Sequence, residues 1–471
     1  MTTGGTMSRR AVVIGGSVAG LLAAAALSRS VDDVIVLERD ELPDGPHPRK
    51  RIPQARHAHI LLPSGRDAIQ ELLPEADVRQ RLLTSGAVEQ SMTGMLGFGA
   101  QGWYRRWPTV ADELLLTCCS RDLLDSVLRD AVLGTTRVTV RRAEALSLLG
   151  TAERVTGVRV LADGSEEDLS ADLVVDASGR GTRVEPWLDR LGVADIPTDE
   201  VDSGLVYASR VFRVPRGAED FPLTQVEADP AASRPGRSGV LVPIEDGRWL
   251  VSLAGTRGGE PTADPEEFTD FALGLRHPLV GQLISGAEPL SEVFLSRSTR
   301  NRRREFERAA MPEGLVVLGD AVATYNPVHG QGMSVAALGA QALSRQLQQA
   351  DVTAAGFARD VQRAAARSVS AAYTVSTSQD QWFPEVVGRA PTLADSLLSR
   401  YRGRMARVAT TSYSVYAAMR AVVTLQADAS SLLRPKLLLA TLKGPVMEPL
   451  TGPPLTPGES AFVDSMGPVL V

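Results

Sequence analysis

Cysteine and lysine are both scarce in this chain of 471 residues. The two cysteines are neighbours, Cys118 and Cys119, and no spaced pair exists. The sequence therefore argues against a disulfide framework or a thiolate metal site, and the pattern fits a reducing cytoplasm. We expect both cysteines to be small buried core residues. The three lysines are Lys50, Lys436 and Lys443, so arginine carries nearly all of the positive charge.

Positive charge is also in deficit, because the formal net charge at pH 7 is −6. A nucleic-acid-binding protein recruits arginine and lysine in excess to meet the phosphate backbone, so that class of partner is disfavoured. One dense basic cluster does occur, at Arg300–Arg308 (RNRRREFER), and Glu305 and Glu307 interrupt it. We interpret this cluster as a solvated face.

A long hydrophobic run is missing as well. Residues 8–29 (SRRAVVIGGSVAGLLAAAALSR) combine paired arginines with a charge-free apolar stretch, as a secretory signal does. The stretch is short for a membrane span, and it contains several glycines. We therefore expect no stable membrane insertion, and the glycines require another explanation.

The glycines belong to a strand–turn–helix–strand unit. The segment AVVIGGSVAGLLAAAALSRSVDDVIVLERD predicts a strand at Ala11–Ile14, a helix at Ser17–Ser30 and a strand at Val34–Leu37. An acid follows the second strand, and this order is the fingerprint of dinucleotide binding. The helix N-terminus, with its free N–H groups and partial positive charge, is then expected to meet a pyrophosphate.

Each position of this fingerprint has a physical role. Gly15 forms the tight turn, Gly20 lets the helix pack on the sheet, and Glu38 stands where a ribose-binding carboxylate belongs. Ser17 replaces the middle glycine of the pattern. Serine is small, and its hydroxyl can donate to a phosphate oxygen. The predicted cofactor contacts in this unit are Gly15, Gly16, Ser17, Val18, Ala19, Gly20 and Glu38.

A second strand-to-aspartate motif, GLVVLGDAVATYNPVHGQGM, lies some 300 residues downstream. One nucleotide site serves NAD or FAD equally well, but a second glycine turn before a helix suits a long cofactor lying across the sheet. Asp320 can accept a hydrogen bond from a ribityl hydroxyl, and backbone N–H groups at the next helix start can meet the anionic edge of a reduced flavin. We therefore predict FAD extended between two helix N-termini. The predicted contacts here are Asp320, Pro327, Gly330, Gln331, Gly332 and Met333.

These two motifs resemble those of the FAD-dependent group A monooxygenases, the family of p-hydroxybenzoate hydroxylase. GGSVAGL with Glu38 and Arg39 looks like the first motif of that family, and GDAVATYNPVHGQGM looks like its second. The resemblance implies that Arg121, in SRDLL, contacts the FAD pyrophosphate region and that Arg49 reaches the cofactor. It implies an α/β fold with a Rossmann-like FAD-binding domain of the GR2 type.

A narrower resemblance rests on RKRIPQARHAHILL at 49–62, together with QGWYRRWP at 101–108 and DASGRGTR at 176–183. These segments are similar to a bacterial subgroup that includes the polyether-ionophore epoxidases making lasalocid and monensin. Arg51 departs from this pattern, which has glycine there. Ser178 stands where the fold usually has an aspartate that contacts FAD and NADPH. The electron source implied is therefore either NADPH directly or a partner flavin reductase.

The function implied by the resemblance is monooxygenation. Reduced flavin and O2 would form a C4a-hydroperoxide, which transfers oxygen to alkenes of a hydrophobic polyketide polyene in polyether antibiotic biosynthesis. Hydroxylation of an aromatic polyketide, a saturating reductase and a flavin-less carrier on the same fold are the alternatives. A halogenase is disfavoured because no lysine lies between Lys50 and Lys436 and because WYRRW replaces WxWxIP.

No catalytic triad, paired-carboxylate motif or HExxH is present. His57 and His59 form an HxH pair at metal-ligand spacing, but no third ligand is apparent, so we expect no metal. Weaker candidates for a substrate wall are Trp103, Tyr325 and His329, although a core role is the commoner one for a tryptophan.

The rest of the chain divides by its pattern. We predict an FAD-binding domain at 8–190 with 296–345, with an excursion into the substrate domain near 86–110. An inserted antiparallel β-sheet substrate domain covers 191–295, including one helix at 264–275. A turn at Asp163-Gly164 predicts a hairpin. Residues 346–471 form a helical C-terminal region that would serve as a lid, as a homodimer face or as support for the core, and it ends in a loop at TGPPLTPGES.

Overall fold

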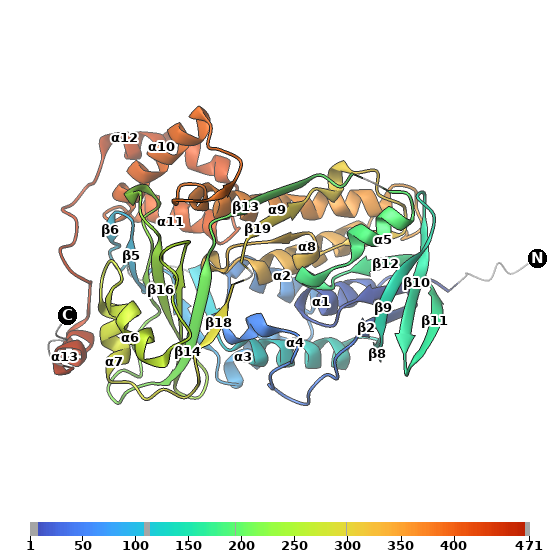
Figure 1. Cartoon of the computed structure of the whole chain (residues 1–471), viewed down its shortest axis with the longest axis horizontal. Helices are drawn as coiled ribbons and strands as arrows, with labels where there is room; N and C mark the ends of the chain where they lie inside the picture. The colour runs from blue at the N-terminus through green and yellow to red at the C-terminus, as the bar shows by residue number, and fades with distance from the viewer. Residues whose placement is uncertain (1–7, 108–113, 194, 298, 467–471) are drawn as a thin grey trace, which may run out of the picture.

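The computed structural model describes residues 8–107, 114–193, 195–297 and 299–466. Figure 1 shows a nucleotide-binding lobe beside a lobe built on a large antiparallel sheet, with C-terminal helices along the outer edge of the second lobe. The predicted α/β fold, with an inserted β-sheet domain and a helical C-terminal region, is confirmed.

A five-stranded parallel sheet forms the centre of the nucleotide-binding lobe. Helices cover one face, and a small three-stranded sheet with one helix covers the other, which explains why its strands are apolar on both sides. The predicted strands and first helix are confirmed. In order across the sheet the strands are β20 (Leu315–Val317), β12 (Leu173–Asp176), β1 (Arg10–Ile14), β2 (Asp33–Glu38) and β8 (Val138–Arg142).

The helices on the first face are α1 (Val18–Leu27), α2 (Pro63–Leu72), α3 (Val78–Thr84), α4 (Arg121–Thr135) and α8 (Gly332–Leu347). The opposite face carries β9 (Glu144–Gly150), β10 (Val155–Ala162), β11 (Ser165–Ser170) and α5 (Val184–Arg190). The predicted hairpin joins β10 to β11. Asp163 (φ +49°) and Gly164 (φ +81°) both adopt the left-handed conformation that such a tight turn requires.

A seven-stranded sheet forms the second lobe, and it draws its strands from distant parts of the chain. Its pairs are antiparallel except for β15 with β5, which is parallel. Helices α6 (Pro265–Leu273) and α7 (Leu279–Ser285) pack on one face. The strands in order are β18 (Phe294–Ser296), β14 (Val206–Arg213), β17 (Arg248–Gly255), β16 (Arg237–Ile244), β15 (Thr224–Val226), β5 (Leu96–Gly99) and β6 (Gly102–Trp103).

A smaller sheet is formed by β3 (Ile60–Leu61), β7 (Leu115–Cys118) and β4 (Val88–Ser91), and its apolar side chains share a core with those of the seven-stranded sheet. Cys118, at the end of β7, and Cys119 are both buried free cysteines. Burial raises the pKa of the Cys118 thiol to about 12, so this group stays protonated and behaves as a small apolar side chain. The prediction of core cysteines is confirmed.

The basic cluster Arg300–Arg308 is not a solvated face, which corrects our interpretation. Its middle forms β19 (Asn301–Arg304), which pairs with β13 (Thr198–Asp202) and with β21 (Ala323–Thr324). Arg304 is buried and donates to Glu185, and Arg302 pairs with Glu185 and Glu200. The sequence pattern missed this because the acidic partners lie more than 100 residues away in the chain.

The C-terminal region is helical, as predicted. It contains α9 (Phe357–Asp380), α10 (Leu393–Ala409), α11 (Tyr413–Val423), α12 (Pro435–Lys443) and α13 (Pro457–Ser465), with β22 (Val387–Gly388) between the first two. The predicted loop at TGPPLTPGES is wrong for its second half, where α13 begins. Thr456 and Glu459 form a capping box there, and Pro457 occupies the first helical turn, where its missing N–H is harmless. None of the helices within the described residues is long and apolar enough to cross a bilayer.

Candidate functional site

The turn between β1 and α1 has the backbone geometry that the fingerprint predicts. Gly15 has φ +106°, and a Cβ atom added there would lie 2.5 Å from the carbonyl oxygen of Ala177. A Cβ atom on Gly20 would lie 1.8 Å from the carbonyl oxygen of Gly15. Both positions therefore require glycine, one for conformation and the other for the close approach of α1 to the turn.

Glu38, at the end of β2, closes this turn from the other side. Its Oε2 accepts from the backbone N–H of Gly16 at 2.9 Å and lies 2.5 Å from Nη2 of Arg49. Burial tends to raise the pKa of Glu38, but the Arg49 guanidinium and the backbone donors outweigh burial, and the net pKa is lowered. Glu38 is therefore a fixed carboxylate beside the start of α1. Arg39, which follows it, has an exposed side chain.

Arg49, which the resemblance implies reaches the cofactor, lies in the same corner as Glu38 and Gly16. Its Nη1 donates to the carbonyl of Gly16 at 3.0 Å, and its side chain is almost fully buried. The Nε atom has no hydrogen-bond partner among the described residues. One guanidinium donor is thus unsatisfied next to the nucleotide fingerprint.

Arg121 reaches the start of α1 from the first turn of α4. Its Nη2 donates to Oγ of Ser17 at 2.8 Å, and its Nε donates to Asp125 at 2.8 Å. Ser17 is the N-cap residue of α1, but its hydroxyl makes no capping bond to the helix backbone. The first N–H groups of α1, Ser17 and the Arg121 guanidinium therefore converge as an anion-binding corner.

Asp320 follows β20 in a short 3-10 turn, Gly319–Ala321. Gly319 has φ +63°, and an added Cβ atom there would lie 2.8 Å from Cβ of Ala19, so the second motif packs directly on the start of α1. Burial raises the pKa of Asp320, and the charges of Arg180 and Arg121 partly offset this increase. Both predicted motifs are brought together, although 300 residues separate them in the chain.

The glycine turn before α8 is built as a second uncapped helix start. Pro327–His329 form a 3-10 turn, Gly330 adopts the left-handed conformation (φ +64°), and α8 begins at Gly332. The N-cap residue Gln331 makes no capping bond. Its Nε2 instead donates to the carbonyl of Val423 at 2.8 Å, and its buried Oε1 has no partner in the described part of the chain. Met333, in the first turn of α8, is buried.

FAD fits this arrangement of residues. Both helix starts lack side-chain caps, and the close approaches at Gly15 and Gly20 leave no Cβ atom in the corner between β1, α1 and β12. Oε1 of Gln331 is buried without a partner in the described part of the chain, as is Nε of Arg49. Unsatisfied buried polar atoms are rare in folded proteins, so these two atoms point to a polar ligand.

Arg180 is a site residue that the sequence reasoning did not single out. It lies on a 3-10 turn, Gly179–Gly181, and its side chain is exposed. Its charge partly offsets the burial that raises the pKa of Asp320, and it adds to the burial that lowers the pKa of His57. This exposed guanidinium, for which no ion pair occurs among the described residues, can bind an anionic portion of a cofactor or substrate. The signal in the sequence is an arginine within the glycine-rich segment DASGRGTR.

The histidines near the site are held neutral. Burial, together with the charge of Arg180, lowers the pKa of His57 to about 4. Burial lowers the pKa of His59 to about 3 and that of His329 to about 4. Nδ1 of His57 lies 2.8 Å from the hydroxyl of Ser209 on β14. No group of three or more metal-ligating side chains occurs among the described residues.

Asp380, at the end of α9, anchors the glycine turn and was also missed. Nδ2 of Asn326 donates to both carboxylate oxygens of Asp380, at 2.9 and 3.0 Å, and Nδ2 of Asn301 donates at 2.7 Å. Oδ1 of Asn326 accepts from the Tyr207 hydroxyl at 3.1 Å. This buried network ties the turn to the C-terminal helices and to the seven-stranded sheet. No local motif announces it, because its members lie far apart in the sequence.

We expect Asp380 to make stability depend on pH. Its folded-state pKa is raised to about 6, because desolvation outweighs the amide donors. The folded state therefore binds a proton more tightly than the unfolded state, and the contribution of Asp380 to stability is lost as pH rises from about 4 to about 6. The unfolding free energy of wild type minus that of Asp380→Asn should fall by on the order of 1 kcal/mol across this window. Urea titrations of both proteins measure this difference, and a difference that stays flat or rises would contradict the assignment.

The three weaker candidates separate in the structure. His329 lies in the glycine turn, and Tyr325 precedes this turn, buried in the core with Tyr373 and with no partner for its hydroxyl among the described residues. Trp103 instead lies in the core of the second lobe, with its ring 4.8 Å from that of His277 and 5.1 Å from that of Phe98. The structure does not bring Trp103 together with the other two.

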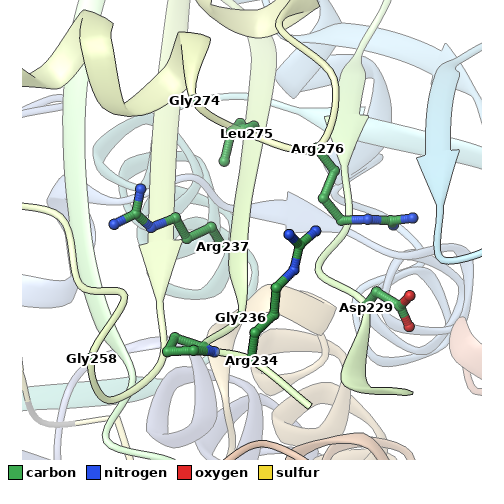
Figure 2. Close-up of a pocket in the computed structure, with 9 residues that line it drawn as sticks. Asp229, Arg234, Gly236, Arg237, Gly258, Gly274, Leu275 and Arg276 are labelled. Carbon is green, nitrogen blue, oxygen red and sulfur yellow. The ribbon is translucent and has the colours of Figure 1, made fainter. Parts of the chain in front are cut away.

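A separate cavity of about 510 Å³ lies in the second lobe, near the start of β16 and the end of α6. Figure 2 shows Arg234, Arg237 and Arg276 around it, with Asp229 at one side. The Arg276 guanidinium is engaged by backbone carbonyls, including those of Gly99 and Ala100. The cavity contains none of the predicted FAD contacts, so it is not part of the site described above.

The geometry of the nucleotide-binding lobe defines the class of protein as a flavoprotein of the α/β FAD-binding fold. The chain belongs to the family described as FAD binding domain, whose model matches residues 9–359. Protein Rv3254 of Mycobacterium tuberculosis is 32% identical over 378 residues, which are 77% of this chain and 78% of that protein.

Solved structures show the same fold. The Diels-Alderase PyrE3 from the biosynthetic pathway of pyrroindomycins aligns with a TM-score of 0.62 at 19% identity, over 90% of this chain and 81% of that chain. The protein pqsL of Pseudomonas aeruginosa, described as a probable FAD-dependent monooxygenase, aligns with a TM-score of 0.55 at 16% identity, over 79% of this chain and 97% of that chain. FAD is thus the cofactor that the family and the site geometry both indicate.

Proposed function

We propose that this protein is an FAD-dependent monooxygenase that epoxidises alkenes of a hydrophobic polyketide polyene, as in polyether antibiotic biosynthesis. The observation that carries the proposal is the contact between the glycine turn and the seven-stranded sheet. Val328 packs on Leu205, Tyr207 and Ala254, and Tyr207 also donates to Asn326. The turn expected to hold the flavin ring is therefore covered on this side by an apolar contact with β14 and β17 of that sheet.

Bound FAD would supply the redox chemistry, because reduced flavin activates O2 for transfer of one oxygen atom. The residues of this chain would bind the cofactor, orient it and exclude water. The anion-binding corner of Ser17 and Arg121 would hold the pyrophosphate end, Asp320 would hold the ribityl chain, and the amides after Pro327 would hold the ring. An apolar cover suits oxygen transfer, since water competes with the substrate for the activated oxygen.

The protonation states of nearby groups favour an alkene over a phenol. Phenol hydroxylation is usually helped by a base that removes the phenolic proton. The pKa values of about 4 for His57 and His329 make these imidazoles neutral and weakly basic. Burial also raises the pKa of the Tyr207 hydroxyl. An isolated alkene needs no such base, so epoxidation is preferred here to the hydroxylation of an aromatic polyketide.

The source of electrons is part of the proposal. Ser178 replaces the aspartate with which relatives contact NADPH, and the exposed Arg180 two residues later offers a cation of the kind that binds phosphate. Oxidation of NADPH by the purified chain alone would indicate direct use. A requirement for added flavin reductase would indicate a partner instead.

We expect the purified protein to be yellow and to incorporate oxygen from O2. Reactions of a polyene substrate under 18O2 should yield a product heavier by the isotope difference for each epoxide formed, as measured by mass spectrometry. Label entering from H2 18O instead would contradict a monooxygenase. Colourless protein that cannot be reconstituted with FAD would favour the flavin-less carrier, and a hydroxylated aromatic product would favour the alternative oxygenation.

A further inference from the structure

The C-terminal helices expose an unusual amount of apolar surface. Leu393 is 86% exposed and Leu397 66% exposed on α10, and Leu442 is 65% exposed on α12. The exposed large apolar side chains between 393 and 447 are Leu393, Leu397, Leu398, Leu433, Leu439, Leu442, Val446 and Met447. Five of them lie on α10 and α12 and the other three lie just before or after α12, and such a concentration marks an interaction surface rather than random surface composition.

These side chains are not needed to build the helical region. The opposite faces of α10 and α12 already pack with α11 in a core, which includes Met405, Val408, Val415, Tyr416 and Leu437. The exposed leucines therefore lie outside a core that is complete without them.

The apolar side chains alternate with cations. On α10, Leu393, Leu397, Arg400 and Arg404 are spaced three or four residues apart, so they share one face of the helix, and all four are exposed. On α12, Leu439 and Leu442 lie beside the exposed Lys436 and Lys443. Arg404 joins the two helices, because its Nε donates to the carbonyl of Thr441 at 2.8 Å and its Nη2 donates to that of Leu442 at 2.6 Å.

Charge is strongly segregated into this part of the chain. From Leu393 to Lys443 there are eight arginines and lysines and two aspartates, a net charge of +6, whereas the whole chain carries −6. Two of the three lysines of the protein lie here. No ion pair of Arg400, Lys436 or Lys443 occurs within the described residues.

We propose that α10 and α12 bind the surface of an anionic lipid bilayer. Leucines flanked by arginine and lysine suit the bilayer interface, where the apolar side chains enter the acyl boundary and the cations reach lipid phosphates. A second copy of this chain on the same face would place the exposed Arg400, Lys436 and Lys443 opposite the same cations, which like-charge repulsion opposes. The association is peripheral, because no described helix is able to span a membrane.

The position of α10 and α12 in the fold suits access of a substrate from the bilayer. Figure 1 shows α10 and α12 along the outer edge of the molecule, away from the nucleotide-binding sheet. The same helical region reaches the candidate site, because Gln331 donates to the carbonyl of Val423 and Tyr416 donates to that of Met92. If the proposed function holds, a lipophilic substrate would approach the site from the bilayer; the binding itself does not depend on that function.

The test is co-sedimentation of the full-length FAD-loaded protein with vesicles. We expect binding to vesicles of phosphatidylcholine mixed with phosphatidylglycerol, weak binding to phosphatidylcholine alone, and release by salt. Changing Lys436 and Lys443 together to alanine should weaken binding about thirtyfold, from about 1 kcal/mol per cation near an anionic surface. Leu393→Ser with Leu397→Ser should also weaken it. The matched control is Leu133→Ser on α4, a partly exposed leucine outside the surface, which should leave binding unchanged.

Bound flavin absorbance verifies that each variant is folded. Equal sedimentation with neutral and anionic vesicles, absence of sedimentation, or unchanged binding by the α10 and α12 variants would overturn the proposal. So would light scattering that shows a homodimer abolished by Leu393→Ser, since the surface would then bind a second copy. Failure of vesicle binding would leave FAD content and oxygen incorporation unaffected, so it is distinguishable from failure of the proposed function.

Discussion

Gly20→Ala is expected to purify without FAD and with a free energy of unfolding lowered by about 1–3 kcal/mol. The added Cβ atom would lie 1.8 Å from the carbonyl oxygen of Gly15, a backbone atom that cannot rotate away. Either α1 moves off the turn or the turn moves off β1, and each movement displaces the helix start expected to meet the pyrophosphate. Flavin absorbance of the purified protein and urea unfolding measure the two effects.

Gly134→Ala is the matched control for this substitution. Gly134 lies near the end of α4, and an added Cβ atom there meets nothing within 4 Å. Alanine is the better helix former by about 1 kcal/mol, so the control should keep FAD and be as stable as the parent or slightly more stable. If Gly20→Ala retained bound flavin, the fingerprint would not be the nucleotide site.

Asp320→Ala is expected to weaken FAD binding by about 10- to 100-fold. A hydrogen bond to a charged group contributes about 1.5–3 kcal/mol, and the structure gives Asp320 no hydrogen bond to another described residue that it would lose. The folded chain should therefore keep its stability in the absence of cofactor while its affinity falls. Burial disfavours the ionised form of Asp320, so removing it should not destabilise the apoprotein.

Titration of apoprotein with FAD, followed by quenching of flavin fluorescence, measures this affinity. Asp270→Ala, an exposed aspartate on α6 in the other lobe, serves as the control and should bind FAD normally. Equal affinities for the two variants would show that Asp320 does not contact the cofactor.

Local patterns were sufficient to predict the nucleotide-binding lobe. β1, α1 and β2 follow from an apolar run, a glycine turn and a second apolar run, and the hairpin follows from Asp163-Gly164. The need for glycine at positions 15 and 20 also follows from the sequence. The fingerprint requires a residue without a Cβ atom at both positions, and the backbone of the structure leaves no room for one. Convergence of Ser17 and Arg121 was implied only by family resemblance.

Long-range partners could not be predicted in the same way. Asp380 acquires its role from Asn326 and Asn301, which contact it across 54 and 79 residues. Arg304 loses its expected exposure because β13 and β21 flank its strand. α13 was missed because proline and glycine suggested a loop, whereas the capping box of Thr456 and Glu459 outweighs that composition. Each error comes from a contact that no short window of sequence contains.

The strand order of the parallel sheet has a consequence for synthesis of the protein on the ribosome. β20 pairs with β12, yet 138 residues separate the end of one strand from the start of the other. At about 5–20 residues per second, the edge of β12 waits roughly 7–28 s for its neighbour to emerge. During that interval the nascent chain presents an unpaired, apolar strand edge. Asp320, which follows β20 in the cofactor site, has not yet been synthesised. A lower growth temperature and an increased supply of chaperones should therefore raise the soluble yield in recombinant hosts.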